Sequence, residues 1–285
     1  MARLLKGAEV VSSLNERITT GAAALDVLGV RPLLALVRVG ERADDVAYER
    51  GLMKRAETVG VSVRQFLLPE TVSQEELLGV IRQINSDASI HGCLIFRPLP
   101  KSIDDERVRA ALAPEKDVDG ITEGSLAGVF SGTKHGFPPC TAQACIEILD
   151  YYGIETLGKT AVVIGRSLVV GKPVAMMLLQ KNATVTLCHT KTADMPSVTR
   201  RADILIVAAG RAGVIGADYV SAGQTVLDVG INFTPEGKMV GDADFAAIEP
   251  LVGAVTPVPG GVGTVTTSVL MAHVVEAARR AQNRE

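Results

Sequence analysis

The sequence alternates short apolar runs of strand length with longer segments of helical periodicity, and this alternation restricts the fold to few possibilities. Near the N-terminus, residues 14–25 place apolar side chains at helical spacing, and residues 32–39 form a nearly continuous apolar run. Strands are predicted at 32–39, 61–68, 91–96, 160–164, 183–187, 204–208 and 225–229, and helices at 43–59, from 74, and at 104–112, 141–152, 170–180 and 265–280. Repeated β/α units of this kind predict an α/β protein with mainly parallel sheets.

The periodicity fails between residues 114 and 139, where Gly, Pro, Asp and Ser accumulate. Such a composition is typical of turns and connections. We therefore predict a linker there, together with the edge of a cleft. Ser73, with Glu76 three residues later, predicts a capping box at the start of the helix that begins near residue 74.

Composition excludes several classes of function. The chain has 285 residues, of which 47% are hydrophobic and 21% charged, so it can bury a large core. Its 29 basic and 32 acidic residues give a net charge of −3, which makes nucleic acid an unfavourable main partner. The four cysteines are scattered and form no CxxC pair, and no apolar run has the length of a signal peptide or membrane span. We predict a cytoplasmic protein with reduced thiols and no metal site.

A Walker A pattern occurs at Gly153–Thr160, but its context argues against a nucleotide site. A P-loop follows a strand and opens a helix, whereas this segment follows a predicted helix and leads into a predicted strand. We interpret it as an exposed turn.

A more suitable phosphate site is the turn between the predicted strand 160–164 and the helix that follows it. This turn contains Gly165 and Gly171, six residues apart, and so departs from the GxGxxG pattern. A glycine-flanked turn of this kind can also serve packing alone. Its position at the start of a β/α series favours dinucleotide binding.

The residues after the second strand of this series indicate which dinucleotide is bound. NAD-binding units carry an acidic residue there, but this chain has Cys188-His-Thr-Lys191. Arg166 on the first turn, with Thr190 and Lys191, could bind the 2′-phosphate of NADP through charge-assisted hydrogen bonds. Lys191 could equally be a solvated surface residue, whereas Arg166 lies on the predicted binding turn.

Two further segments stand out. Lys116–Gly120 places two carboxylates two residues apart, a pattern that also occurs in ordinary surface turns. Thr256–Gly263 has two prolines and three glycines before a predicted helix, which fixes a loop whose backbone can approach a ligand.

These segments, taken with three others, closely resemble the methylenetetrahydrofolate dehydrogenase/cyclohydrolase family over residues 32–280. The other three are Pro139–Thr141, Asp228–Asn232 and Gly241–Phe245. The resemblance implies two β/α domains around a folate cleft: a folate-binding catalytic domain of residues 1–139 plus 264–285, and a Rossmann NADP-binding domain of residues 140–263. It also implies a homodimer.

The resemblance assigns roles to individual residues. Together with the phosphate turn, it gives as cofactor-binding residues Gly165, Arg166, Ser167, Gly171, Thr190 and Ile231. It gives as substrate-binding residues Tyr48, Asp119, Pro259, Gly260, Gly261 and Gly263. Asp119 would hold the pterin, and Tyr48 and Asp119 are the candidate catalytic residues.

The chain departs from the family pattern at two catalytic positions. Leu52 stands where the family has a lysine four residues after the tyrosine, and Phe96 stands where it has a glutamine. Lys54 matches a separate basic position and would lie on another helical face from Tyr48. Smaller departures are Ser125, Ala142 and Thr264.

The two family reactions depend differently on these positions. Hydride transfer from methylenetetrahydrofolate to nicotinamide needs mainly orientation and exclusion of water, whereas hydrolysis of the methenyl product needs a base or a cation near the attacking water. We therefore predict an NADP-dependent dehydrogenase with weak or absent cyclohydrolase activity. The alternatives are a bifunctional enzyme, with water positioned by Asp119 and Tyr48, a non-catalytic binding homologue, and a dehydrogenase for another one-carbon pterin carrier.

Overall fold

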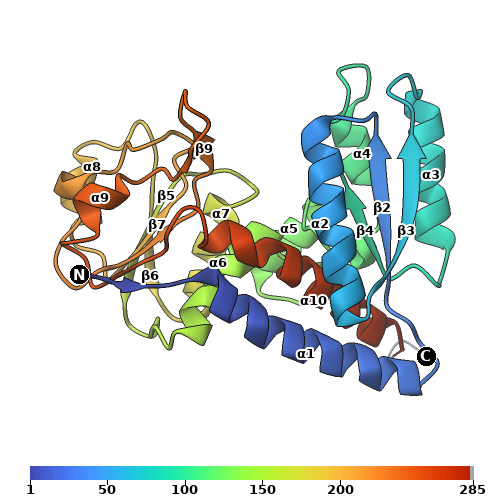
Figure 1. The fold of residues 1–285 in the computed structure, drawn as a ribbon, viewed down its shortest axis with the longest axis horizontal. Helices are drawn as coiled ribbons and strands as arrows, with labels where there is room; N and C mark the ends of the chain where they lie inside the picture. The colour runs from blue at the N-terminus through green and yellow to red at the C-terminus, as the bar shows by residue number, and fades with distance from the viewer. Residues whose placement is uncertain (283–285) are drawn as a thin grey trace. The chain divides into compact units, whose positions relative to one another are not determined.

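The computed structural model describes residues 1–282 and contains two compact units (Figure 1). One unit consists of residues 1–12 and 141–266, and the other consists of residues 13–140 and the segment that begins at Thr267. Each unit has its own parallel sheet, which confirms the predicted α/β class. We refer to them as the six-stranded unit and the three-stranded unit.

The three-stranded unit is built on a sheet of order β3-β2-β4, with all strands parallel. The strands are β2 (Leu33–Val39), β3 (Ser62–Leu68) and β4 (Gly92–Ile95). The helices are α1 (Gly7–Val27), α2 (Ala43–Val59), α3 (Gln74–Ser86), α4 (Asp105–Ala111), α5 (Glu123–Ser131) and α10 (Val262–Gln282), with a 3₁₀ turn at Pro114–Lys116; the first residues of α1 and α10 fall in the six-stranded unit. Central strand β2 is buried from Leu34 onward, as expected of a parallel strand covered on both faces.

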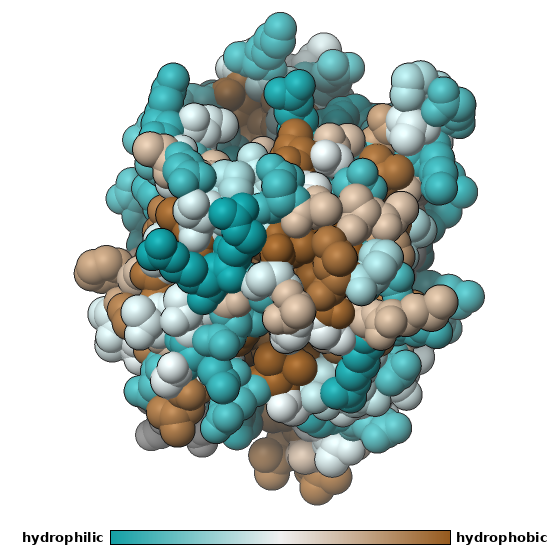
Figure 2. All heavy atoms as spheres, turned by 90° about the vertical axis from the view of Figure 1, so that its left-hand side faces the viewer, coloured by the Kyte–Doolittle hydropathy of each residue, from teal (hydrophilic) through white to brown (hydrophobic). Residues whose placement is uncertain are grey.

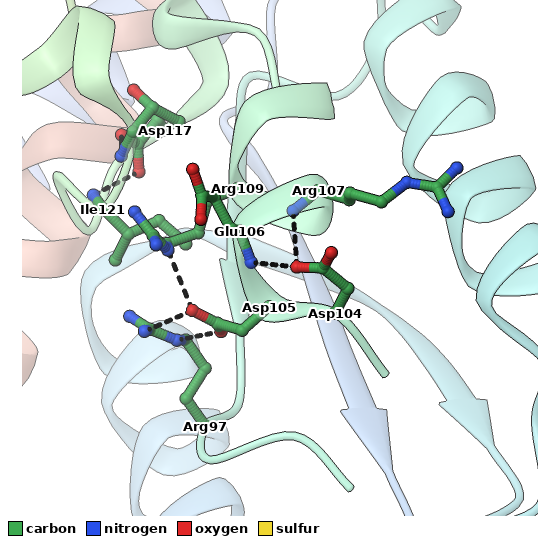
Figure 3. A network of polar contacts seen from close by, with 9 residues as sticks. Arg97, Asp104, Asp105, Glu106, Arg107, Arg109, Asp117 and Ile121 are labelled. Carbon is green, nitrogen blue, oxygen red and sulfur yellow. Dashed lines mark hydrogen bonds and ion pairs between the residues drawn. The ribbon is translucent and has the colours of Figure 1, made fainter. Parts of the chain in front are cut away.

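Local signals in the sequence account for the helix ends. The capping box of α3 is confirmed: the Ser73 hydroxyl accepts the Glu76 amide at 3.3 Å, and the Glu76 carboxylate accepts the Ser73 amide at 2.9 Å. Asp104 caps α4 by accepting the amides of Glu106 and Arg107 at 3.0 and 3.2 Å (Figure 3). These caps fix where the helices begin at the carboxyl edge of the sheet.

The predicted linker at 114–139 is in part wrong, because it contains helix α5. This helix has only nine residues, and its sequence EGSLAGVFS is rich in small residues, so periodicity does not reveal it. Its start is set by Thr122, whose hydroxyl accepts the amide of Ser125 at 3.1 Å.

The six-stranded unit has a parallel sheet of order β1-β11-β8-β7-β5-β6. Its strands are β1 (Arg3–Leu4), β5 (Thr160–Ile164), β6 (Thr184–Cys188), β7 (Ile204–Val207), β8 (Thr225–Asp228) and β11 (Ala254–Val255), and its other elements are α6 (Cys140–Tyr151), α7 (Gly171–Gln180), α8 (Met195–Thr199), α9 (Phe245–Ile248), a 3₁₀ turn at Ala217–Tyr219 and the antiparallel pair β9 (Asn232–Phe233) and β10 (Met239–Val240). The first twelve residues thus complete a sheet whose other strands come from the second half of the chain.

Two sequence interpretations can be compared directly with these elements. The Walker A segment connects α6 to β5, which is the reverse of the order a P-loop needs, so its interpretation as a turn is confirmed. Within residues 1–282, no helix combines the length and the apolar character needed to cross a membrane.

Candidate functional site

A cavity of about 650 Å³ lies at the carboxyl ends of β5, β6, β7 and β8 in the six-stranded unit. Five of the predicted cofactor-binding residues line it: Gly165, Arg166, Ser167, Thr190 and Ile231. Ligands of open parallel sheets bind at this edge, next to the strand where the order reverses. The cavity is therefore the candidate dinucleotide site.

The turn between β5 and α7 is closely packed, which explains its two glycines. Gly165 has φ +120°, and a Cβ there would overlap the carbonyl oxygen of Ala208. A Cβ on Gly171 would overlap the carbonyl oxygen of Gly165, so only glycine lets α7 begin this close to the turn. The turn residues Gly165, Arg166, Ser167 and Val170 thereby line the cavity immediately before α7, where a dinucleotide phosphate would lie.

The polar lining of the cavity fits the predicted 2′-phosphate contact in part. Arg166 and Thr190 both line it, and the residues after β6 bring no carboxylate to it. The side chain of Lys191 is not among the lining residues; its backbone amide donates to His189 Nδ1 at 3.1 Å. Sequence reasoning missed His189 and Arg211, which also line the cavity.

Two buried aspartates hold the cavity wall that contains Ile231. Asp228 accepts the amides of Gly230, Asp242 and Ala243 at 2.9, 3.0 and 2.9 Å. Burial nevertheless raises the pKa of Asp228 to about 6, although these amides act to lower it. Asp242 in turn accepts the amide of Gly210 at 2.7 Å and the side chain of Asn232 at 2.8 Å. The sequence motifs contain both aspartates, but their mutual contacts are visible only in the fold.

The predicted ligand loop, Thr256–Gly263, lies beside this wall. Gly260 has φ +102°, and a Cβ on Gly263 would lie 3.3 Å from Cδ1 of Ile231. A Cβ on Gly261 would lie 2.5 Å from the carbonyl oxygen of Pro257, so the loop depends on glycine here too. Pro259, which follows a cis peptide bond, completes the turn that leads into α10.

In the three-stranded unit, buried hydrophobic side chains occupy the two positions at which the chain differs from the family's lysine and glutamine. Leu52 on α2 is 1% exposed, and Phe96 at the end of β4 is 7% exposed. The ring of Phe96 meets the ring of Tyr48 edge to face, with centroids 5.7 Å apart. Tyr48 is 44% exposed, and its hydroxyl group hydrogen-bonds Thr267.

The chain immediately after Phe96 is held by charge. Arg97 donates two hydrogen bonds to the carboxylate of Asp105, at 2.7 and 2.8 Å, and Arg109 donates a third at 2.8 Å (Figure 3). A carboxylate that accepts hydrogen bonds from two guanidinium groups restrains the positions of its neighbours better than a single exposed ion pair does. This network fixes the backbone next to Phe96 against α4.

Asp119 and Tyr48 are brought together by the fold. Burial raises the pKa of Asp119 to about 6, the charge of Asp117 adds to this, and the Cys140 thiol and Arg97 partly offset it. Burial, together with Cys140 and Asp119, raises the pKa of Tyr48 to about 12 despite its bond to Thr267. Both groups therefore keep their protons more tightly than in water.

Asp117, the other carboxylate of the turn, has a structural position. It is fully buried and accepts the amides of Ile121 and Thr122 at 3.0 and 2.7 Å; Figure 3 shows its contact with Ile121.

All four cysteines are buried and free. Within residues 1–282, no three His, Cys, Asp or Glu side chains are grouped so that they could hold a metal ion.

A parallel sheet with a glycine-bounded turn after β5, facing a cavity at the carboxyl ends of its strands, is typical of a dinucleotide-binding domain. Comparison with known families identifies the particular one. Residues 5–119 match the tetrahydrofolate dehydrogenase/cyclohydrolase catalytic domain, and residues 139–282 match the NAD(P)-binding domain of the same family. The chain belongs to the tetrahydrofolate dehydrogenase/cyclohydrolase family.

Individual relatives agree with this assignment over their whole length. The chain is 48% identical to "Bifunctional protein FolD" of Carboxydothermus hydrogenoformans, and the match covers 97% of each chain. The crystal structure of the bifunctional FolD enzyme from Campylobacter jejuni matches with a TM-score of 0.95 at 37% identity and covers 100% of both chains. The Trypanosoma brucei FolD structure, complexed with NADP and an inhibitor, matches with a TM-score of 0.90 at 32% identity, over 99% of this chain and 98% of that one. The predicted family, fold and enzyme class are confirmed.

Proposed function

We propose that the protein oxidises 5,10-methylenetetrahydrofolate to 5,10-methenyltetrahydrofolate with NADP as hydride acceptor. The observation that carries the proposal is the candidate dinucleotide cavity, which Arg166 and Thr190 line and to which the segment after β6 contributes no carboxylate. The relative from Trypanosoma brucei, which was solved with NADP, supports the same cofactor. The cofactor, when bound, accepts the hydride; the protein holds it and orients the substrate.

We propose that Asp119 and Tyr48 bind the pterin ring of the substrate. A carboxylate can accept two hydrogen bonds from the amide edge of a pterin, and Asp119 is a carboxylate near enough to Tyr48 to raise the pKa of its hydroxyl group. The Tyr48 ring, which is 44% exposed, offers an apolar surface on which a planar ring can pack. Tyr48, with its pKa raised to about 12, acts as a neutral hydroxyl group.

We further propose that the cyclohydrolase reaction is weak or lost. Leu52 and Phe96 carry no group that can move a proton or stabilise a charge, and both are packed away from water. A bifunctional enzyme is the second candidate, because the relatives are named bifunctional and because Asp119, with a pKa of about 6, could itself act on water near neutral pH.

One assay tests the proposed function. Purified protein is mixed with methylenetetrahydrofolate and NADP, and NADPH and the methenyl product are followed at their separate absorbances. We expect both to accumulate together. Absence of NADPH would leave a non-catalytic homologue or an enzyme for another one-carbon pterin carrier.

Arg166→Ala should reduce the preference for NADP over NAD. A charge-assisted hydrogen bond to a phosphate contributes about 1.5 to 3 kcal/mol, so the ratio of kcat/KM values for the two cofactors should fall by about 10- to 150-fold. Arg211→Ala serves as the matched comparison, since Arg211 lines the same cavity from the loop after β7. An unchanged ratio in Arg166→Ala would contradict the assignment.

The assembly and location are also proposals. Hydrophobic side chains gather near the centre of the face in Figure 2, and an exposed apolar patch supports an interaction surface such as that of a homodimer. The net charge of −3 supports a role without nucleic acid, and four free, buried cysteines support the reducing cytoplasm. Sedimentation of the purified protein tests the dimer.

A further inference from the structure

The turn that carries Asp119 is held from several directions within the three-stranded unit. The carboxylate of Asp117 binds the two amides that follow the turn, at Ile121 and Thr122. Gly120 has φ +70°, and a Cβ there would overlap the backbone of Pro139. The turn is therefore fixed at its C-terminal side, and its orientation depends on the peptide group between Val118 and Asp119.

That peptide group is bound by side chains from two distant parts of the sequence. The carbonyl oxygen of Val118 lies 2.8 Å from Nδ1 of His273 on α10 and 3.3 Å from Sγ of Cys140 at the start of α6. Because the carbonyl accepts, Nδ1 of His273 carries the proton and donates it. The carbonyl belongs to the same planar peptide as the amide of Asp119, so holding it also holds the N–Cα bond from which the Asp119 residue continues.

The His273 ring is itself held in place. It is 9% exposed and packs on Phe137, with ring centroids 5.0 Å apart. The guanidinium of Arg280 lies 4.3 Å from the Phe137 ring and donates to the carbonyls of Lys134 and Gly136 at 3.0 and 2.8 Å. Burial lowers the pKa of His273 to about 4, so the ring is neutral at physiological pH and keeps one donor for Val118.

We infer that His273 is a positioning residue that directs the Asp119 carboxylate toward the substrate by fixing the Val118–Asp119 peptide. The inference rests on the proposed function, in which Asp119 binds the pterin. Cys140 assists at the same carbonyl, and its thiol also contacts the Asp119 carboxylate. The remaining charged or titratable groups near Asp119 are Asp117, Arg97 and Tyr48.

The test compares His273→Phe with His273→Asn. Phenylalanine keeps a ring against Phe137 but has no donor, whereas the Nδ2 of asparagine can occupy the place of the imidazole Nδ1. We expect His273→Phe to raise KM for methylenetetrahydrofolate by about five- to tenfold while the Kd for NADP stays unchanged, and His273→Asn to restore most of the loss. His91→Leu is the control: His91 is another buried histidine of this unit and accepts the Leu33 amide at 3.2 Å, so its loss should lower Tm without changing KM.

A second readout is independent of folate. Carbon-13 labelling of the aspartate carboxyl groups allows the titration of Asp119 to be followed by NMR in the substrate-free protein. In His273→Phe the released turn admits water, so the midpoint should fall toward the ordinary range, and in His273→Asn it should return. If His273→Phe does not fold, His273→Leu provides the same comparison, because leucine also lacks a donor for the Val118 carbonyl.

The outcomes distinguish a failure of the proposed dehydrogenase function from a failure of the positioning role of His273. A wild-type protein that fails to oxidise methylenetetrahydrofolate contradicts the proposed function, and the NMR titration then decides the positioning role alone. An active wild type whose KM and Asp119 midpoint are both unchanged in His273→Phe overturns the positioning role. So does a His273→Asn variant that folds normally but behaves like His273→Phe.

Discussion

Replacing Asp119 with alanine is expected to lower kcat/KM for methylenetetrahydrofolate by about 10²- to 10⁴-fold. This range corresponds to losing two hydrogen bonds to a charged group, each contributing about 1.5 to 3 kcal/mol. The Kd for NADP should not change, because Asp119 belongs to the three-stranded unit and the cofactor cavity to the six-stranded unit. Steady-state kinetics and a cofactor titration measure the two quantities.

The pH dependence of the wild type provides an independent check. The carboxylate must be ionised to accept two donors from the pterin, and the pKa of Asp119 is raised to about 6. KM for the folate should therefore rise as the pH falls below about 6 and should be constant well above it. Asp119→Asn keeps the size of the side chain and removes this dependence. Near-normal turnover in Asp119→Ala would place the pterin contact elsewhere.

The second large effect concerns hydrolysis. The wild type should release methenyltetrahydrofolate that decays only at the uncatalysed rate, whereas Leu52→Lys combined with Phe96→Gln should hydrolyse it measurably. Residues 48 and 52 are four apart on α2, so a lysine at 52 can extend along the same face toward the tyrosine hydroxyl. General acid–base groups contribute about 10²- to 10⁴-fold, so partial restoration would still exceed the background.

The single variant is expected to behave differently from the double variant. Leu52 is 1% exposed, and Phe96 is 7% exposed, so a lone lysine would be buried against apolar neighbours and would tend to lose its charge. Leu52→Lys alone should lower Tm and give little hydrolysis. Leu52→Met with Phe96→Gln is the matched control, because it opens the same wall without adding a charge. Rapid hydrolysis by the unmodified protein would refute the proposal and favour activation of water by Asp119.

The sequence predicted most of the regular structure because the longer elements have clear periods. Helix α2 spans 43–59 as predicted, and Ser73 and Glu76 form the predicted capping box. The strands β1 and β11 were missed because two residues cannot show a period, and their pairing depends on a partner about 250 positions away. Only tertiary structure brings such segments together.

The site was predictable to a similar degree. Glycine spacing and the order of strand and helix predicted the turn that lines the candidate cavity, because those signals are local. The contacts of Asp228 with Asp242, and of His273 with the Val118 carbonyl, join segments far apart in sequence. No pattern in a single sequence reports such contacts.

The place of β1 in the six-stranded sheet affects how the protein can be made in the cell. Arg3 and Leu4 pair with Ala254 and Val255, so β1 has no partner strand until about 250 further residues have been synthesised. The three-stranded unit likewise needs the segment after Thr267 to bind the Val118 carbonyl. Neither unit can therefore be completed before the segment that contains β11 and α10 has been synthesised. A fragment that begins at residue 141 would lack β1 and leave an edge of β11 unpaired.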